Sequence, residues 1–199
     1  LMENLYNKRI RLTKAMTLFR ETFVRTNELA TRAMKVHNGI GVEGPKDKPN
    51  KQYVTFADNS DTWDAALDKE VYATLLKNYR EQVDAEFLPD FYRTIDEKFG
   101  GDYTSYVNDV WDNSILMKSG EKIYINKKSF KKDLGIVMGL DITDVMHKIN
   151  APLMELSDSI RLQERYLCAA KIRMEEDLPH YSDANFTMRL SYGQVGGYD

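Results

Sequence analysis

Residues 181–198 read Tyr-Ser-Asp-Ala-Asn-Phe-Thr-Met-Arg-Leu-Ser-Tyr-Gly-Gln-Val-Gly-Gly-Tyr, a strand-like stretch in a chain that otherwise favours helices. Between residues 186 and 195, aromatic, β-branched and aliphatic side chains lie among polar ones, and turn-forming residues flank the segment. A lone strand cannot pair its own backbone N–H and C=O groups. It therefore either folds back on the chain or belongs to a sheet whose other strands lie elsewhere, and we favour the second interpretation.

The composition is that of a folded protein, with 42% hydrophobic and 30% charged residues among 199. This length suffices for one domain or two small ones. A net charge of −3 gives no basic footprint, so nucleic acid is not an expected partner. No apolar run of about 18 residues occurs, so no membrane span is expected. Cys168 is the single cysteine and permits no internal disulfide.

Apolar residues spaced by three, four and seven positions predict two long helices, over residues 3–36 and 143–176. No proline or glycine interrupts the first helix, which is expected to continue to a stop at Gly39. We expect the two helices to pack antiparallel. The first helix has a polar face opposite its apolar stripe, made by Lys8, Lys14, Glu21, Arg25, Glu28 and Arg32.

The second long helix has features that bear on its start and its shape. Asp141 or Thr143 is expected to cap its first turn, and its apolar stripe is expected to reach Met174. Pro152 lies inside it. Because proline lacks an N–H and its ring clashes with the preceding turn, a kink is expected near Lys148.

Shorter elements are expected between the two long helices. A helix is expected over residues 64–83, with an apolar stripe of Leu67, Val71, Leu75 and Tyr79 and with Leu76 beside it. A second helix stops at Gly100-Gly101, and Asp102 is a good N-cap for a third. Residues 38–60 are a connection rich in glycine and proline, and residues 129–138 favour a helix. A short strand is compatible with residues 122–126.

The sequence contains no complete catalytic set, no metal-binding set and no cofactor motif. Three histidines lie in separate segments: His37, His147 and His180. None is part of the paired histidine or cysteine spacings that zinc sites use. Cys168 is interpreted as a buried, inert thiol rather than a nucleophile. Arg189 is expected to pair with Asp183 or Glu175, and the alternative is that it faces a ligand.

Two segments near the C-terminus resemble the family of bacterial serine exopeptidases that includes dipeptidyl-peptidases 7 and 11. Residues 165–170 read Arg-Tyr-Leu-Cys-Ala-Ala. Residues 181–195 follow the family pattern Tyr-Pro-Asp-Ala-Asn-x-Thr-x-Arg-Leu-x-Tyr-Gly, with Ser182 in place of the usual proline. A looser similarity extends the match to about residues 64–198. The motif residues, to which no role is assigned, are Asp183, Asn185, Thr187, Arg189, Tyr192 and Gly193.

The resemblance implies a chymotrypsin-like double barrel with an inserted α-helical domain. Residues 1–180 would be the helical cap domain, and residues 181–199 the incomplete start of the second barrel. The expected fold class is therefore mainly α: an irregular helical bundle with two long antiparallel helices and a C-terminal strand from a barrel outside this chain. The family's catalytic serine, histidine and aspartate also fall outside, so no catalytic, cofactor-binding or metal-binding residue is assigned here.

The resemblance also implies a function. The full-length enzyme would release dipeptides from the free N-termini of oligopeptides, in the periplasm or at the cell surface, without a cofactor. This chain would be inactive alone, because triad members act as a unit. A homodimer is compatible with this expectation. The first alternative is a helical scaffold for protein–protein interactions without catalytic activity, and the second is a module whose terminal strand pairs with an extended peptide.

Overall fold

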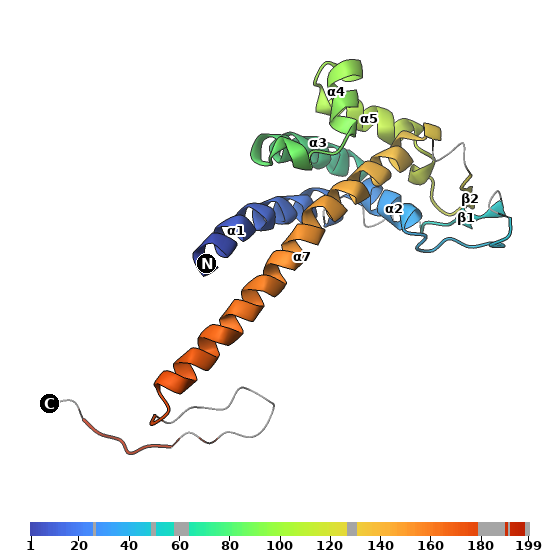
Figure 1. The fold of residues 1–199 in the computed structure, drawn as a ribbon. Coiled ribbons are helices and arrows are strands. Elements are labelled where there is room, and N and C mark those ends of the chain that lie inside the picture. Colours follow the sequence, from blue (N-terminus) through green and yellow to red (C-terminus); the bar gives the residue numbers. More distant parts are fainter. Residues whose placement is uncertain are drawn as a thin grey trace. The chain divides into compact units, whose positions relative to one another are not determined.

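The computed structural model describes residues 1–25, 27–48, 51–57, 64–126, 131–178, 190 and 192–197 (Figure 1). The chain divides into two compact units, Leu1–Ile160 and Arg161–Asp199. Helices dominate, so the expected mainly α class is confirmed. In chain order the elements are α1 (Met2–Phe19), the π-helix η1 (Arg20–Val24), α2 (Glu28–His37), β1 (Tyr53–Val54), α3 (Ala65–Gln82), the 3₁₀ turn η3 (Ala85–Phe87), α4 (Phe91–Phe99), α5 (Tyr103–Asn113), the 3₁₀ turn η4 (Ile115–Met117), β2 (Ile123–Tyr124) and α7 (Leu134–Met174).

The first long helix is divided, which corrects the prediction of one continuous helix over residues 3–36. After α1 the chain makes the π-helical turn η1, and Asn27 then adopts an extended conformation with φ −135° and ψ 120°. The side chain of Asn27 accepts a hydrogen bond of 2.7 Å from the N–H of Ala30 and so caps α2. The π-helical turn inserts an extra residue into the helical repeat and changes which side chains face inward.

The core of the first unit is built around Phe23, in the π-helical turn η1. Its ring centroid lies 5.0 Å from Tyr79 and 6.2 Å from Phe91, both in edge-to-face geometry. The surrounding tyrosines keep their hydroxyl groups bonded: Tyr79 donates to the carbonyl of Phe87 at 3.0 Å, and Tyr92 to that of Leu76 at 2.7 Å. Aromatic rings thus fill the space between α1, α3 and α4 without leaving these hydroxyl groups unpaired.

The ends of the middle helices follow the predictions. Asp102 accepts hydrogen bonds from the N–H groups of Thr104 and Ser105 and caps α5. Gly100 ends α4 with φ 61°, in the left-handed region that glycine enters without strain.

The face that α3 buries is rotated from the predicted stripe, although Tyr79 of that stripe is buried as predicted. Leu67 is 58% exposed and Val71 is 37% exposed, while Tyr72 and Leu76 point into the core. Asp68 explains the rotation of α3, because its buried carboxylate accepts from the side chain of Asn27 at 3.4 Å. The same carboxylate accepts from the N–H of Glu28 at 3.3 Å, so α3 is held at the start of α2 by bonds between distant segments.

The helix α7 begins earlier than predicted, and Asp133, rather than Asp141 or Thr143, caps it. Oδ1 of Asp133 accepts from the N–H of Ile136 at 3.0 Å and from the Ser114 hydroxyl at 2.8 Å. Its other oxygen, Oδ2, accepts from the N–H of Ile115 at 2.8 Å. One carboxylate therefore caps α7 and also fixes the start of η4, 18 residues earlier in the chain.

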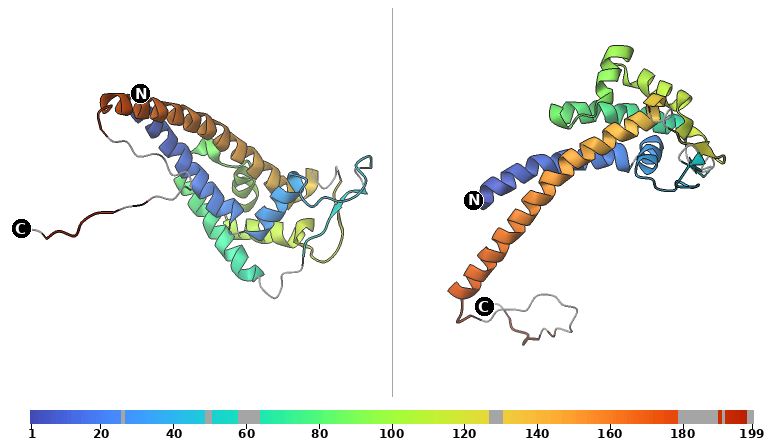
Figure 2. Two further views of the ribbon diagram at one scale, coloured as in Figure 1. Left: turned by 90° about the horizontal axis from the view of Figure 1, so that it is seen from below. Right: turned by 45° about the vertical axis from the view of Figure 1, so that its right-hand side comes forward.

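Gly139 sets the contact between α7 and α2. A Cβ atom at this position would lie 2.6 Å from Cβ of Ala33 and 2.9 Å from its carbonyl oxygen. The two backbones approach this closely because residue 139 has no side chain. α1 and the part of α7 before Arg161 run in opposite directions, as Figures 1 and 2 show and as predicted.

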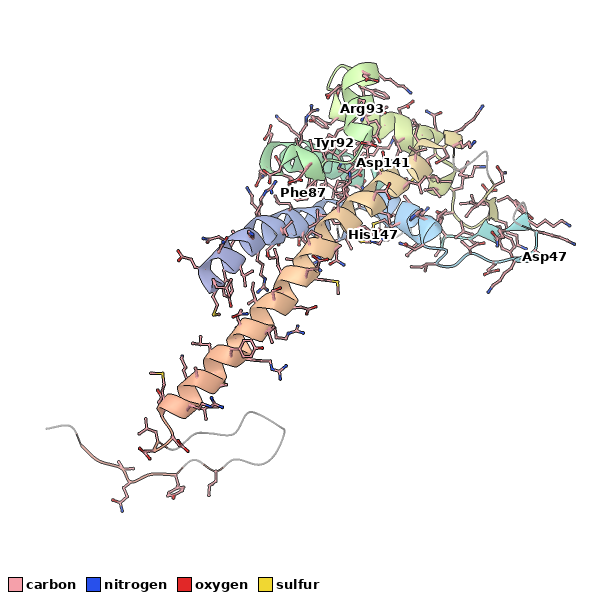
Figure 3. All side chains as sticks on the ribbon, viewed as in Figure 1. Asp47, Phe87, Tyr92, Arg93, Asp141 and His147 are labelled. Carbon is pink, nitrogen blue, oxygen red and sulfur yellow. The ribbon has the colours of Figure 1, made fainter. Side chains whose placement is uncertain are left out.

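Pro152 does not interrupt α7, which is helical from Leu134 to Met174. Figure 3 labels His147, which precedes Lys148, and the ribbon of α7 shows no sharp bend there, so the predicted kink is not seen. A single proline removes one backbone hydrogen bond, and the turns on either side keep theirs.

A small antiparallel sheet pairs Tyr53 with Tyr124 and Val54 with Ile123. β2 confirms the short strand expected within residues 122–126. β1 lies in a segment predicted to be only a connection, since two strand residues give too weak a pattern to recognise from sequence.

The second unit comprises the last turns of α7 and the segment after it. Leu167 and Met174 were predicted to lie on a buried stripe but are 46% and 85% exposed. Of the strand expected over residues 186–195, residues 186–189 and 191 lie outside the described residues. Leu190 and residues 192–195 are described and have no regular secondary structure.

Candidate functional site

The residues singled out from the sequence do not form one site in the described part of the chain. No group of three or more histidine, cysteine, aspartate or glutamate side chains suited to a metal occurs among the described residues. His147 is exposed on α7, and His180 lies outside the described residues. Cys168 is exposed, so its interpretation as a buried thiol was wrong.

The six motif residues are only partly described. Asp183, Asn185, Thr187 and Arg189 lie outside the described residues, and so does the expected ion pair of Arg189. Tyr192 is 93% exposed, and Gly193 follows it in irregular, exposed backbone. Their roles therefore stay unassigned.

A first candidate site is a pocket of about 350 Å³ between α4 and the first turns of α7. Figure 3 labels Arg93 on α4 and Asp141 on α7, two of the charged residues that line it. Its charged and polar lining consists of Asp90, Arg93, Thr94, Glu97, Tyr106 and Asp141. Arg93 approaches Asp90 at 3.7 Å. It is the single cation in the lining, which has three carboxylates: Asp90, Glu97 and Asp141.

Asp141 carries the unusual electrostatics of this acidic pocket. Burial first, and then the negative charges of Asp90 and Asp144, raise the pKa of Asp141 from its ordinary value of 3.8 to about 6. A hydrogen bond from the N–H of Phe91, at the start of α4, acts in the opposite direction and lowers the pKa. The sequence suggested only a capping role for Asp141, since the approach of α4 is not visible in it.

The raised pKa predicts that Asp141 opposes folding at neutral pH. The folded state binds the proton more tightly than the unfolded state, so this contribution to stability falls as the pH rises from about 4 to about 6. After a discount for solvent screening of a half-buried group, the cost above pH 6 is about 1 kcal/mol. Asp141→Asn should therefore raise the free energy of unfolding by about 1 kcal/mol at pH 8 and have little effect near pH 4.

Urea unfolding at several pH values measures this difference. Glu155→Gln is the matched control, because Glu155 is exposed further along the same helix and does not contribute to the raised pKa of Asp141. It should change stability by less than about 0.5 kcal/mol. A lower stability of Asp141→Asn than of the unchanged chain at pH 8 would contradict the prediction.

A second candidate site is a groove of about 600 Å³ between α1, η3 and α7, called here the α1–α7 groove. Its lining residues are Asn7, Lys8, Arg11, Leu12, Glu86, Phe87, Lys148, Pro152 and Leu156. Arg11 forms ion pairs with Asp84 and Glu86, and its guanidinium lies 5.5 Å from the ring centroid of Phe87, which Figure 3 labels. Sequence reasoning placed Lys8 on a polar face and missed the groove, because α1 and α7 are brought together only by folding.

The class of protein that these features define is a mainly α unit with its own aromatic core and open surface pockets. Among the residues described, none of the helices combines the length and apolar composition that crossing a membrane requires. The part of the chain that the structure describes holds no assembled catalytic triad or metal centre.

Comparison with known proteins gives the family. The family model of peptidase S46 matches residues 1–199. Dipeptidyl-peptidase 7 of Phocaeicola vulgatus is 32% identical over 194 residues, which cover 92% of this chain and 27% of that protein. An Asp/Glu-specific dipeptidyl-peptidase of Porphyromonas gingivalis is 26% identical, with 96% of this chain and 28% of that protein covered.

A further relative, dipeptidyl-peptidase 7 of Porphyromonas endodontalis, is 28% identical over 97% of this chain and 24% of its own length. The chain belongs to the peptidase S46 family. It spans about a quarter of the length of these curated relatives.

Proposed function

We propose that this chain is the helical cap domain of a serine dipeptidyl-peptidase that releases dipeptides from free peptide N-termini. The observation that carries the proposal is the peptidase S46 match over residues 1–199. The relatives are named as dipeptidyl-peptidases, and each is several times longer than the matched region. A quarter-length segment with a helical core of its own suits one part of such an enzyme better than the whole.

In this proposal the chain restricts access to the active site and supplies no catalytic residue. Residues 1–180 form the cap, and residues 181–199 lead back into the second barrel of the peptidase domain. The catalytic serine, histidine and aspartate come from barrel segments outside this chain. The cap covers the cleft and restricts access to peptide ends, so that a fold suited to internal cleavage acts on N-termini. The enzyme works in the periplasm or at the cell surface.

The proposal predicts that catalysis requires the longer protein. This chain and a longer protein that contains it are assayed with fluorogenic dipeptidyl substrates, with and without a serine-directed reagent. The longer protein should release dipeptides and lose activity with the reagent, whereas this chain should show no turnover above buffer, because triad members act as a unit.

The control substrate is the same dipeptide with an acetylated N-terminus, which the longer protein should leave intact. Two results count against the proposal: reagent-sensitive turnover by this chain alone, or equal turnover of free and acetylated substrates by the longer protein.

A second candidate function is an interaction scaffold without catalytic activity, and one observation favours it. The last turns of α7 expose several large apolar side chains: Leu162, Tyr166, Leu167, Ile172 and Met174. Apolar residues gathered in this way are typical of surfaces that another protein covers. A longer protein that contains this chain, binds a partner protein specifically and releases no dipeptides would favour this function.

A further inference from the structure

The α1–α7 groove combines apolar surface with cationic rims. Leu12 and Phe87 are buried and form its floor, with relative exposures of 8% and 5%. Pro152 and Leu156 of α7 are half-buried and add apolar surface on the opposite wall. The volume of about 600 Å³ lies within the range of ligand pockets, and this mixture of a nonpolar floor with a few charged groups is typical of them.

The charges of the groove do not cancel. Arg11 is held by Asp84 and Glu86, so it is not free to bind an anion. Lys8 and Lys148 are exposed on opposite helices and form no ion pair with any residue in the described ranges. With Asp84 included as a partner of Arg11, the groove has three cations and two carboxylates, an excess of one positive charge, although the whole chain has a net charge of −3.

This local excess of positive charge determines the chemistry of a suitable ligand. A carboxylate between two lysines gains favourable interactions without displacing an existing partner. An apolar side chain beside that carboxylate would remove surface of the half-buried Pro152 and Leu156 from water. A polyanion such as nucleic acid fits less well, because the net negative chain repels charge that extends beyond the groove.

We propose that the α1–α7 groove binds an extended acidic peptide, with its carboxylates at Lys8 and Lys148 and an apolar side chain against Pro152 and Leu156. The identity of this peptide rests on the proposed function. In an N-terminal dipeptidase the groove would hold the part of the substrate that follows the released dipeptide.

Binding is measured on this chain by fluorescence anisotropy. The probe is a short fluorescein-labelled peptide in which glutamate alternates with leucine, and its control has glutamine at every glutamate. The acidic peptide should bind about tenfold more tightly than the glutamine peptide, and the difference should shrink as salt screens the exposed charges.

Charge reversal tests the place of binding. K8E/K148E should weaken binding of the acidic peptide by about tenfold or more, because two attractive pairs become repulsive. The matched control K14E/K77E makes the same change in net charge at exposed lysines outside the groove, and it should change binding less than about twofold. N7W narrows the groove without altering its charge and should weaken the binding of both peptides. Circular dichroism verifies that each variant is folded.

Three results would overturn the proposal: no binding of the acidic peptide, equal binding of the two peptides, or equal effects of the two double reversals. The two proposals can fail separately. If the longer protein releases no dipeptides but this chain still binds the acidic peptide in the groove, the proposed function is overturned and the proposed binding site stands. If dipeptides are released, substrates with glutamate after the released dipeptide should have a lower KM than those with glutamine, and K8E/K148E should abolish that difference.

Discussion

Arg32→Met is expected to lower the free energy of unfolding by about 3 to 5 kcal/mol, the largest effect of any single change considered for this chain. Arg32 is 1% exposed in the first unit, although its spacing placed it on the polar face of a helix. Its Nε donates to Glu28 at 2.9 Å, and its Nη1 donates to the carbonyl oxygen of Leu116 at 3.0 Å and to the Ser119 hydroxyl at 3.2 Å.

The cost arises from the groups that would lose their partner. Methionine fills a similar volume but donates no hydrogen bond, so the carboxylate of Glu28 and the carbonyl of Leu116 would remain partly buried and unpaired. The guanidinium also lies 4.8 Å from the ring centroid of Phe56, and that cation–π contact would be lost. Arg32 thus joins α2, η4 and the segment after β1.

Arg25→Met is the matched control, because Arg25 also pairs with a glutamate four residues away, Glu21 at 2.9 Å. That pair is exposed, so its loss should change stability by less than about 0.5 kcal/mol. Urea unfolding followed by circular dichroism compares the two variants. Equal destabilisation by both would show that Arg32 does not hold these segments together.

Gly139→Ala is expected to lower the free energy of unfolding by about 2 to 3 kcal/mol. The new Cβ would lie 2.6 Å from Cβ of Ala33 and 2.8 Å from its carbonyl carbon, so α2 and α7 would have to move apart. The higher helix propensity of alanine opposes this effect by about 1 kcal/mol, and the clash outweighs it because backbone atoms cannot rotate away.

Ser159→Ala measures the helix-propensity effect alone, since Ser159 is exposed on the same helix. That variant should be unchanged or slightly more stable in thermal unfolding. A Gly139→Ala chain as stable as the Ser159→Ala chain would mean that α2 and α7 do not touch at Ala33.

Local sequence patterns determined the features of this protein that depend on a few neighbouring residues. Asp102 caps α5 because its carboxylate reaches N–H groups two and three residues further along the chain. Gly100 ends α4 because its left-handed conformation is available to glycine at no cost. The similarity to the peptidase family in residues 165–170 and 181–195 was equally visible in the sequence.

Tertiary structure decided everything that joins distant residues. Asp68 turns α3 toward α2, Arg32 is buried by η4, and Gly139 is placed against Ala33. The acidic pocket of Asp141 and the α1–α7 groove exist only because α7 packs against segments far from it in the chain. Periodicity along one helix gives its buried side only approximately, whereas hydrogen bonds and close contacts with other segments fix its rotation and its neighbours.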